Sequence, residues 1–184
     1  MFPAEALARV MTQRGWKVML ATDKRGQNYA QNFPAQKIIA LDAATGSGPV
    51  GLIKAGFAII KGVGQASTAF STLGADVVVG FGGYPSAPAL TAAIATRRAT
   101  VIHEQNAVLG KTNRLLAAAV DTVAAAFPNV GRAPKSVAET IYVVGNPVRS
   151  DIGALYNRVY KAPADNAPIN VLITGGSQGA RILP

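Results

Sequence analysis

Apolar residues recur along the chain at two different spacings, and each spacing predicts a different element. Within residues 59–73 apolar side chains come at intervals of three and four, which predicts a helix with one buried face. Residues 76–81 form a nearly unbroken apolar run of strand length, which is typical of a strand covered on both faces. Strand-like and helix-like segments alternate over most of the chain. We therefore expect a parallel sheet with helices on both faces.

The pattern places most of these elements individually. Helices are expected over residues 3–14, 59–73, 86–98 and 111–119, and strands over residues 17–22, 37–41, 76–81, 100–103, 121–126 and 141–144. Ser86 is expected to cap the third of these helices, with Pro88 in its first turn. Ligand sites in a Rossmann-like α/β fold of this kind form at the carboxyl ends of the strands. The loops that follow the strands are therefore the candidates for function.

The last part of the chain predicts a second unit. Residues 157–168 are polar and contain prolines, as linkers do, and residues 169–174 predict a fresh strand followed by a glycine-rich turn. We expect one domain over residues 1–156, a linker over 157–168 and the start of a second Rossmann-like domain over 169–184. A doubly wound domain normally opens with a strand, whereas this chain opens on a helix. The first domain is therefore expected to lack its first strand, and the chain to be a fragment.

Composition narrows the class of protein. A chain of 184 residues with 49% hydrophobic and 15% charged residues is not of the disordered class. Because cysteine is absent, disulfides, thiolate zinc sites and a cysteine nucleophile are excluded, and His103 is the single histidine. The net charge of +9 favours an anionic partner, such as nucleic acid, an anionic membrane surface or a phosphorylated substrate. Neither a transmembrane stretch nor a secretory signal is recognisable, so the expected location is the cytoplasm or a membrane surface facing it.

Residues 50–73 bear on the membrane alternative. They combine Phe57 and Ile60 with Lys54 and Lys61, and no acidic residue lies between Asp42 and Asp76. This pattern permits a basic, apolar patch that contacts a membrane surface. It also fits a helix that packs one face on the sheet and keeps its lysines in water.

Two polar loops follow strands of the first domain. Gly82 and Gly83 lie between a predicted strand and a predicted helix, where glycines let backbone N–H groups approach an anion. The alternative is a tight turn that binds nothing. Residues 103–106 are four consecutive hydrogen-bonding side chains that end the next strand, and such groups are costly to bury without a purpose. Alternatively, His103 and Glu104 satisfy the local backbone and set the shape of the loop.

Two further segments could bind anions. Residues 145–149 follow the last strand of the first domain, and the planar guanidinium of Arg149 suits a phosphate or an oxygen-rich ring edge. The same residues could instead form a turn with a solvated arginine. Residues 175–180 form a glycine turn that predicts an anion site at the mouth of the second domain. The spacing of these glycines differs from GxGxxG, so it gives only weak support to a dinucleotide site.

Five segments taken together are recognisable. GFGGYPSAP, HEQNAVLGKTNR, AAFPN, GNPVR and GGSQGAR, in this order and spacing, resemble members of glycosyltransferase family 28, which have the two-domain GT-B fold. The resemblance covers nearly the whole chain. It implies an inverting transfer of N-acetylglucosamine from UDP-N-acetylglucosamine to lipid I, which forms lipid II in peptidoglycan synthesis. The implied location is the cytoplasmic face of the bacterial plasma membrane, with an anionic membrane surface as partner and no nucleic acid.

The resemblance also implies roles for individual residues. By motif, the residues on the donor side are Asn106, Arg149 and Ser177, and those on the acceptor side are Gly82, Gly83, Tyr84, His103 and Glu104. No cofactor is implied, and the absence of an Asp-x-Asp pair argues against a metal held by carboxylates. The histidine that serves as general base belongs to a GGTGGH motif expected before Met1, and most uridine contacts belong to the second domain. The 184 residues alone are therefore expected to be inactive.

Other functions remain open at this stage. A different sugar-nucleotide enzyme of GT-B type, such as a diacylglycerol glycosyltransferase or an epimerase, would carry similar loops. A non-catalytic membrane-surface module that binds polyprenyl diphosphates would share the charge and the apolar stretch. Nucleic-acid binding would explain the net charge of +9, but the sequence contains no recognition motif for it.

Overall fold

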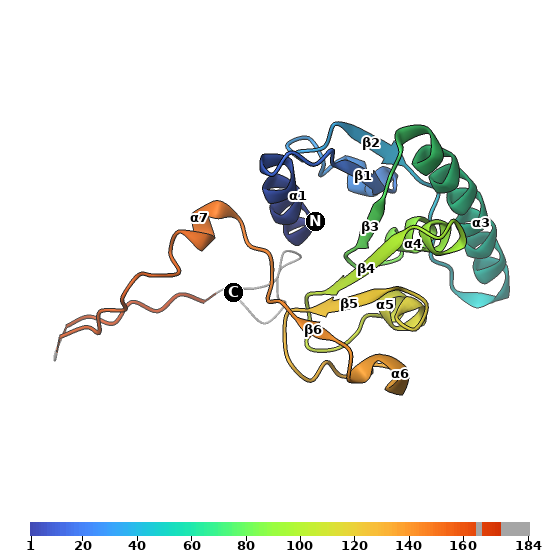
Figure 1. Ribbon diagram of the computed structural model, residues 1–184. Helices are drawn as coiled ribbons and strands as arrows, with labels where there is room; N and C mark the ends of the chain where they lie inside the picture. The colour runs from blue at the N-terminus through green and yellow to red at the C-terminus, as the bar shows by residue number, and fades with distance from the viewer. Residues whose placement is uncertain (165–166, 174–184) are drawn as a thin grey trace.

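The computed structural model describes residues 1–164 and 167–173, which form parallel strands with helices on both sides (Figure 1). The helices are α1 (Phe2–Gln13), α2 (Lys24–Gln27), α3 (Gly48–Leu73), α4 (Ser86–Ala95), α5 (Lys111–Leu116), α6 (Lys135–Ala138) and α7 (Ser150–Gly153). The strands are β1 (Met19–Thr22), β2 (Lys37–Ala40), β3 (Val77–Gly80), β4 (Ala99–Glu104), β5 (Thr122–Ala125) and β6 (Tyr142–Val143). The predicted α/β class is confirmed.

The strands form two separate parallel sheets. β1 pairs with β2, and the second sheet has the order β3-β4-β5-β6. Helices α3 and α4 lie on one side of the strands and α1 on the other (Figure 1). Although no ladder joins β1 to β3 within the described residues, Met19 of β1 and Val78 of β3 pack against the same apolar cluster. The two sheets therefore share one core beneath α3 and α4.

Two apolar clusters hold the domain together. The first joins α3 and α4 to the first sheet and includes Phe70, Ala89, Ala92 and Ala93. The alanines of α4 let α3 approach closely, because they carry only a methyl group. The second cluster lies between β4, β5 and α5 and contains the fully buried Ile102. Burial of this kind is the main favourable contribution to folding.

Within residues 1–156 the predicted strands and the longer helices are present, but their ends differ. The helix expected over residues 59–73 begins earlier, at Gly48, so the glycine-containing stretch before residue 59 is helical as well. The helix expected to reach residue 98 ends at Ala95, because the chain turns there and Arg97 takes a positive φ of 54°. The helix expected over residues 111–119 ends at Leu116. Helices α2, α6 and α7 have four residues each, which is too short for an apolar periodicity, and the sequence pattern did not predict them.

Two local predictions were wrong. β3 is not covered on both faces, since Val77 and Val79 are 43% and 36% exposed. Successive side chains of a strand point to opposite faces, so α3 and α4 cover only the face that carries Val78. Ser86 does not cap α4, because it already lies in the first helical turn and its hydroxyl donates to Gly83 O at 2.9 Å.

The predicted strand over residues 169–174 is also not observed in its described part. Residues 169–173 are irregular, and their apolar side chains are at least 70% exposed. A strand needs a neighbour for its backbone hydrogen bonds, and no described residue pairs with this segment. Thr174 and the glycine turn over residues 175–180 lie outside the described residues. None of the helices in the described ranges combines the length and apolar character that crossing a bilayer requires.

Candidate functional site

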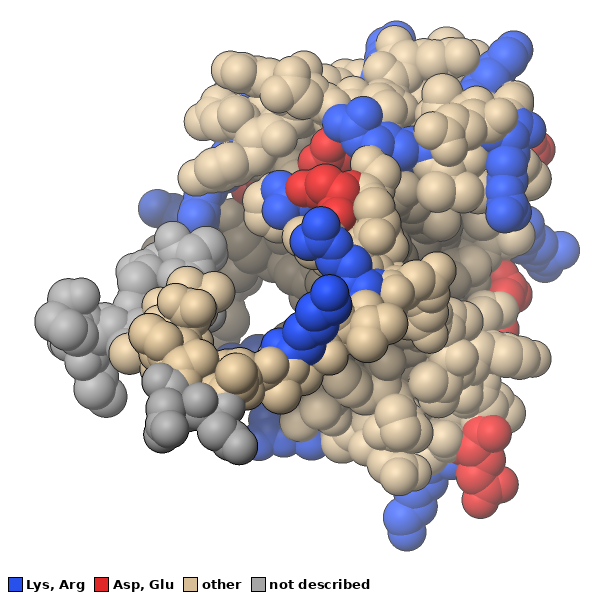
Figure 2. All heavy atoms as spheres, turned by 90° about the vertical axis from the view of Figure 1, so that its left-hand side faces the viewer, with Lys and Arg blue, Asp and Glu red and all other residues tan. Residues whose placement is uncertain are grey.

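The polar loops that the sequence singles out lie at one edge of the strands. The loop at Gly82–Tyr84 follows β3, residues 103–106 end β4, and residues 145–149 follow β6. These strands are parallel, so their carboxyl ends meet at the same edge. Figure 2 looks onto this side of the molecule and shows several Lys and Arg side chains there, with Asp and Glu side chains among them. Together with the net charge of +9, the excess of basic side chains favours an anionic ligand.

Glu104 is the organising residue of this edge. Its side chain is 2% exposed, and its carboxylate accepts four hydrogen bonds. Asn106 donates two of them, from its backbone N–H and its side-chain amide, and Gly110 N and Asn113 Nδ2 donate the others, all at 2.9–3.0 Å. Burial acts to raise the pKa of Glu104, but these donors outweigh it and hold the pKa below its ordinary value. Glu104 is thus an ionised group that shapes its own loop.

Asn113 connects this network to the loop after β3. It is 1% exposed, and a Cβ placed on Gly82 would lie 3.1 Å from its Nδ2 atom. Gly82 also has a φ of +78°, a backbone angle that residues other than glycine rarely adopt. Asn113 Oδ1 is buried and has no hydrogen-bond partner among the described residues. This oxygen is an acceptor with unused capacity next to the glycine loop.

His103 joins the end of β4 to the segment after β6. Its Nε2 atom lies 3.0 Å from Gly145 O, and because a carbonyl only accepts, Nε2 carries the proton in this contact. The ring is buried, and its centroid lies 5.5 Å from the ring centroid of Phe81. Its Nδ1 atom has no hydrogen-bond partner among the described residues. His103 therefore positions the start of residues 145–149.

Two amide side chains complete the links between the loops. Gln105 Nε2 donates to Phe81 O at 2.9 Å, which ties the end of β4 to the end of β3. Asn146 Nδ2 donates to Gln105 O at 3.3 Å, which ties residues 145–149 to the same place. Asn106 itself is held by Glu104, so the predicted donor-side residue Asn106 and the predicted acceptor-side loop belong to one hydrogen-bonded unit.

Tyr84 extends this unit to the first sheet. Its hydroxyl donates to Asp23 Oδ2 at 2.8 Å, and Arg25 Nη1 donates to the same hydroxyl at 3.5 Å. Asp23 is 6% exposed and also accepts from Gly26 N at 2.8 Å, which makes it the N-cap of α2. The hydrogen bond to the Asp23 carboxylate, with burial, raises the pKa of the Tyr84 phenol. Tyr84 is consequently neutral at physiological pH.

Arg149 lies at the other end of the site. Its guanidinium is 5.1 Å from the ring centroid of Phe2, and its Nε atom is 3.9 Å from Asp151 Oδ1. The other predicted donor-side residue, Ser177, lies outside the described residues. Hydrogen bonds thus join His103, Glu104 and Asn106 to the neighbouring loops. Gly82 lies against Asn113, Tyr84 bonds to Asp23, and Arg149 lies over the ring of Phe2.

Sequence reasoning missed Asp23, Asn113 and Phe2 as partners of the site residues. Asp23 carried one usable signal, because an aspartate directly after a strand is a common helix cap. Asn113 lies in the segment HEQNAVLGKTNR, which resembles family 28, but the resemblance implied no binding role for this residue. Nothing in the local sequence around Phe2 indicates its contact with Arg149.

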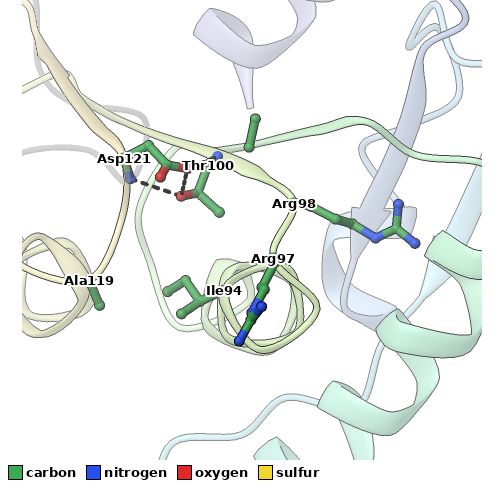
Figure 3. Close-up of a pocket in the computed structure, with 7 residues that line it drawn as sticks. Ile94, Arg97, Arg98, Thr100, Ala119 and Asp121 are labelled. Carbon is green, nitrogen blue, oxygen red and sulfur yellow. Dashed lines mark hydrogen bonds between the residues drawn. The ribbon is translucent and has the colours of Figure 1, made fainter.

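A shallow hollow of about 430 Å³ lies at the opposite edge, at the amino ends of β4 and β5 (Figure 3). There the Asp121 carboxylate accepts from the backbone and the hydroxyl of Thr100 at 2.8 and 2.7 Å, and these bonds lower the pKa of Asp121. Arg98 points away from this pair and stacks over Phe70 at 5.7 Å. Thr100 and Asp121 bond to each other and join β4 to the start of β5, so this pair serves the fold and the hollow is not the candidate site.

A parallel α/β domain whose glycine and polar loops gather at the carboxyl ends of its strands has the architecture typical of phosphate- and nucleotide-binding domains. The sequence profile of the glycosyltransferase family 28 N-terminal domain matches residues 1–125. The chain therefore belongs to glycosyltransferase family 28.

Curated relatives agree over the whole chain. The UDP-N-acetylglucosamine--N-acetylmuramyl-(pentapeptide) pyrophosphoryl-undecaprenol N-acetylglucosamine transferase of Phenylobacterium zucineum is 57% identical, covering 100% of this chain and 51% of the relative. The enzyme of the same name from Mesorhizobium japonicum is 42% identical over 98% of this chain and 48% of its own length. The crystal structure of Acinetobacter baumannii MurG matches with a TM-score of 0.61 and 35% identity, covering 78% of this chain and 40% of that one. The chain spans about half the length of the curated relatives it matches.

Proposed function

We propose that this chain is the acceptor-side half of an enzyme that transfers N-acetylglucosamine from UDP-N-acetylglucosamine to lipid I and so forms lipid II. The observation that supports this most strongly is the single hydrogen-bonded unit that joins three loops at the carboxyl ends of β3, β4 and β6. The names of the relatives supply the substrates and the reaction. In this reaction the bond between the sugar and UDP breaks, and the acceptor hydroxyl oxygen forms the new bond to the sugar.

The chemistry assigns distinct tasks to the two sides of the site. A base must take the proton of the acceptor hydroxyl, and a positive environment must stabilise the leaving UDP. Arg149 and Asn106, with Ser177, are proposed on the donor side. Gly82, Gly83 and Tyr84 are proposed on the acceptor side, where Glu104 and His103 act by holding the loops in place.

The division into an acceptor-side domain, a linker and a second domain is part of this proposal. The break between β1 and β3 supports it, because the two sheets share one core and no ladder joins them within the described residues. A further parallel strand of the longer protein is proposed to pair with β1 and β3, since unpaired edges are otherwise a liability. Residues 157–164, all exposed, are the proposed start of the linker to a second, donor-binding domain.

The test of this function uses the full-length protein. Arg149→Ala is expected to weaken the sugar-nucleotide step by about 1.5–3 kcal/mol, because a charged hydrogen-bond donor is lost. Ser177→Ala should weaken the same step. The measurement is UDP release with a lipid I analogue over a range of UDP-N-acetylglucosamine concentrations. Arg14→Ala, at the far end of α1, is the control, and the 184-residue chain alone should show no turnover. Unchanged kinetics of both site variants would contradict the donor assignment.

Helix α3 supports a second part of the proposal, a location at the cytoplasmic face of the plasma membrane. Five apolar side chains on its first half, which we call the α3 patch, are 61–70% exposed: Val50, Leu52, Ile53, Phe57 and Ile60. Lys54 is exposed beside them, whereas Lys61 forms an ion pair with Asp42 at 2.8 Å. Apolar side chains with a nearby cation are suited to the boundary of anionic lipid headgroups.

Replacing Phe57 and Ile60 together by serine is expected to weaken binding to phosphatidylglycerol vesicles at least about tenfold. Each side chain would otherwise bury apolar area worth about 1.5–3 kcal/mol. Leu115→Ser, which removes an equally exposed side chain from α5, is the matched control. Lys54→Glu and Lys61→Glu should each reduce binding to these vesicles and leave phosphatidylcholine vesicles unaffected, because each replaces a positive charge by a negative one. Equal vesicle sedimentation of wild type and the double variant would remove the α3 patch from the proposal.

A further inference from the structure

The contact between Phe2 and Arg149 joins two parts of the chain between which the described residues form no hydrogen bond or ion pair. Phe2 is the first residue of α1, and Arg149 precedes α7 after the last strand. The guanidinium lies 5.1 Å from the ring centroid, which is within the range of a cation–π interaction. Phe2 is 63% exposed, so the core does not require an aromatic side chain at this position.

Stacking on an aromatic face leaves a guanidinium able to bind. Its N–H groups lie in the plane of the group, whereas the ring contacts only its face. Within the described residues, the one polar partner of Arg149 is the Asp151 carboxylate at 3.9 Å, and both side chains are half or more exposed. An ion pair this long and this exposed contributes little to orientation. The N–H donors of Arg149 therefore remain available while the ring fixes the plane.

The backbone that carries Arg149 is held only at its start. His103 Nε2 donates to Gly145 O, and Asn146 Nδ2 donates to Gln105 O. From Pro147 onward the described contacts of this segment are few, and Val148 is 53% exposed. The Phe2 ring is then the contact that sets where the Arg149 side chain points.

We infer that Phe2 is a positioning residue for the donor side, an aromatic platform that orients the Arg149 guanidinium toward the anionic part of the sugar nucleotide. The inference rests on the proposed donor role of Arg149. It assigns part of donor recognition to the first turn of α1, a helix of the acceptor-side domain. Phe2 does not touch the nucleotide in this role and acts through Arg149.

The first experiment measures the affinity of the full-length protein for UDP-N-acetylglucosamine by calorimetry. Phe2→Leu keeps an apolar side chain but removes the π face, and it should raise Kd about three- to fivefold. Phe2→Tyr keeps the face and should stay near the wild-type value. Trp16→Leu, an exposed aromatic just beyond α1, is the matched control and should change nothing. In an Arg149→Ala background, Phe2→Leu should have no further effect.

A second experiment does not depend on the proposed function. In the 184-residue chain, the ring current of Phe2 should shift the NMR signals of the Arg149 side chain, and Phe2→Leu should abolish that shift. Loss of the shift together with a non-additive Kd effect supports the platform. Absence of a ring-current shift, or the same Kd increase from Phe2→Leu with and without Arg149, overturns it. If Arg149→Ala leaves Kd unchanged, the donor assignment fails and the platform fails with it, even where the NMR shift is present.

Discussion

Glu104→Ala is expected to lower the free energy of unfolding by about 4 kcal/mol, the largest effect of any single substitution at the site. The carboxylate accepts four hydrogen bonds in a nearly water-free environment. Alanine would leave the donors of Asn106, Gly110 and Asn113 without partners, and each buried unsatisfied donor costs about 1–3 kcal/mol. Denaturant unfolding of the 184-residue chain measures this difference.

Glu139→Ala is the matched control for this substitution. Glu139 is exposed at the end of α6 and accepts no described side-chain hydrogen bond, so its removal should change stability by less than about 0.5 kcal/mol. Similar stabilities of the two variants would mean that the Glu104 network does not hold the loop.

The same carboxylate should make stability depend on pH. The pKa of Glu104 lies below its ordinary value of 4.5, so the native state favours the ionised form. Its contribution is therefore complete above the pKa of the unfolded chain and is lost as the pH falls through the lower native pKa. Glu104→Gln should reduce the loss of stability on acidification. Asp42 and Asp121, whose pKa values are also lowered by their hydrogen-bond partners, keep their own contributions in that variant.

Gly62→Ala is expected to destabilise the domain by about 3 kcal/mol, although alanine usually favours a helix. A Cβ at this position would lie 2.1 Å from Asp42 O and 2.9 Å from Pro88 Cβ. The first is a backbone atom and the second belongs to a rigid ring, so neither can move aside cheaply. Overpacking of a tight contact costs about 1–3 kcal/mol and more where the backbone must shift. The missing side chain is thus what lets α3 approach α4 and the end of β2.

Gly64→Ala provides a control within the same helix. A Cβ there meets nothing within 4 Å, so the usual helix preference should apply and stability should rise by about 0.5–1 kcal/mol. Thermal unfolding measures both effects: Gly62→Ala should lower the midpoint temperature, and Gly64→Ala, two residues away, should raise it. Shifts of the same sign would show that α3 does not pack as described.

Several properties of this protein follow from the sequence alone. The kinds and order of the main elements were predictable, because apolar periodicity is a local property and most of the domain alternates between strand and helix. The position of the candidate site was predictable as well. Parallel strands bring their carboxyl ends to one edge, so Gly82, His103, Asn106 and Arg149 could be expected there before any contact was known.

Only the tertiary structure decided what these side chains do. The sequence left open whether Glu104 and His103 bind a ligand or shape their loops, and the structure shows both engaged within the domain. The hydrogen bond from Tyr84 to Asp23 joins residues 61 positions apart, and the stack of Arg149 on Phe2 spans nearly the whole domain. The exposure of Val77 and the break between the two sheets also depend on which strands become neighbours. A local sequence pattern does not predict such distant pairs, because these residues become neighbours only when the chain folds.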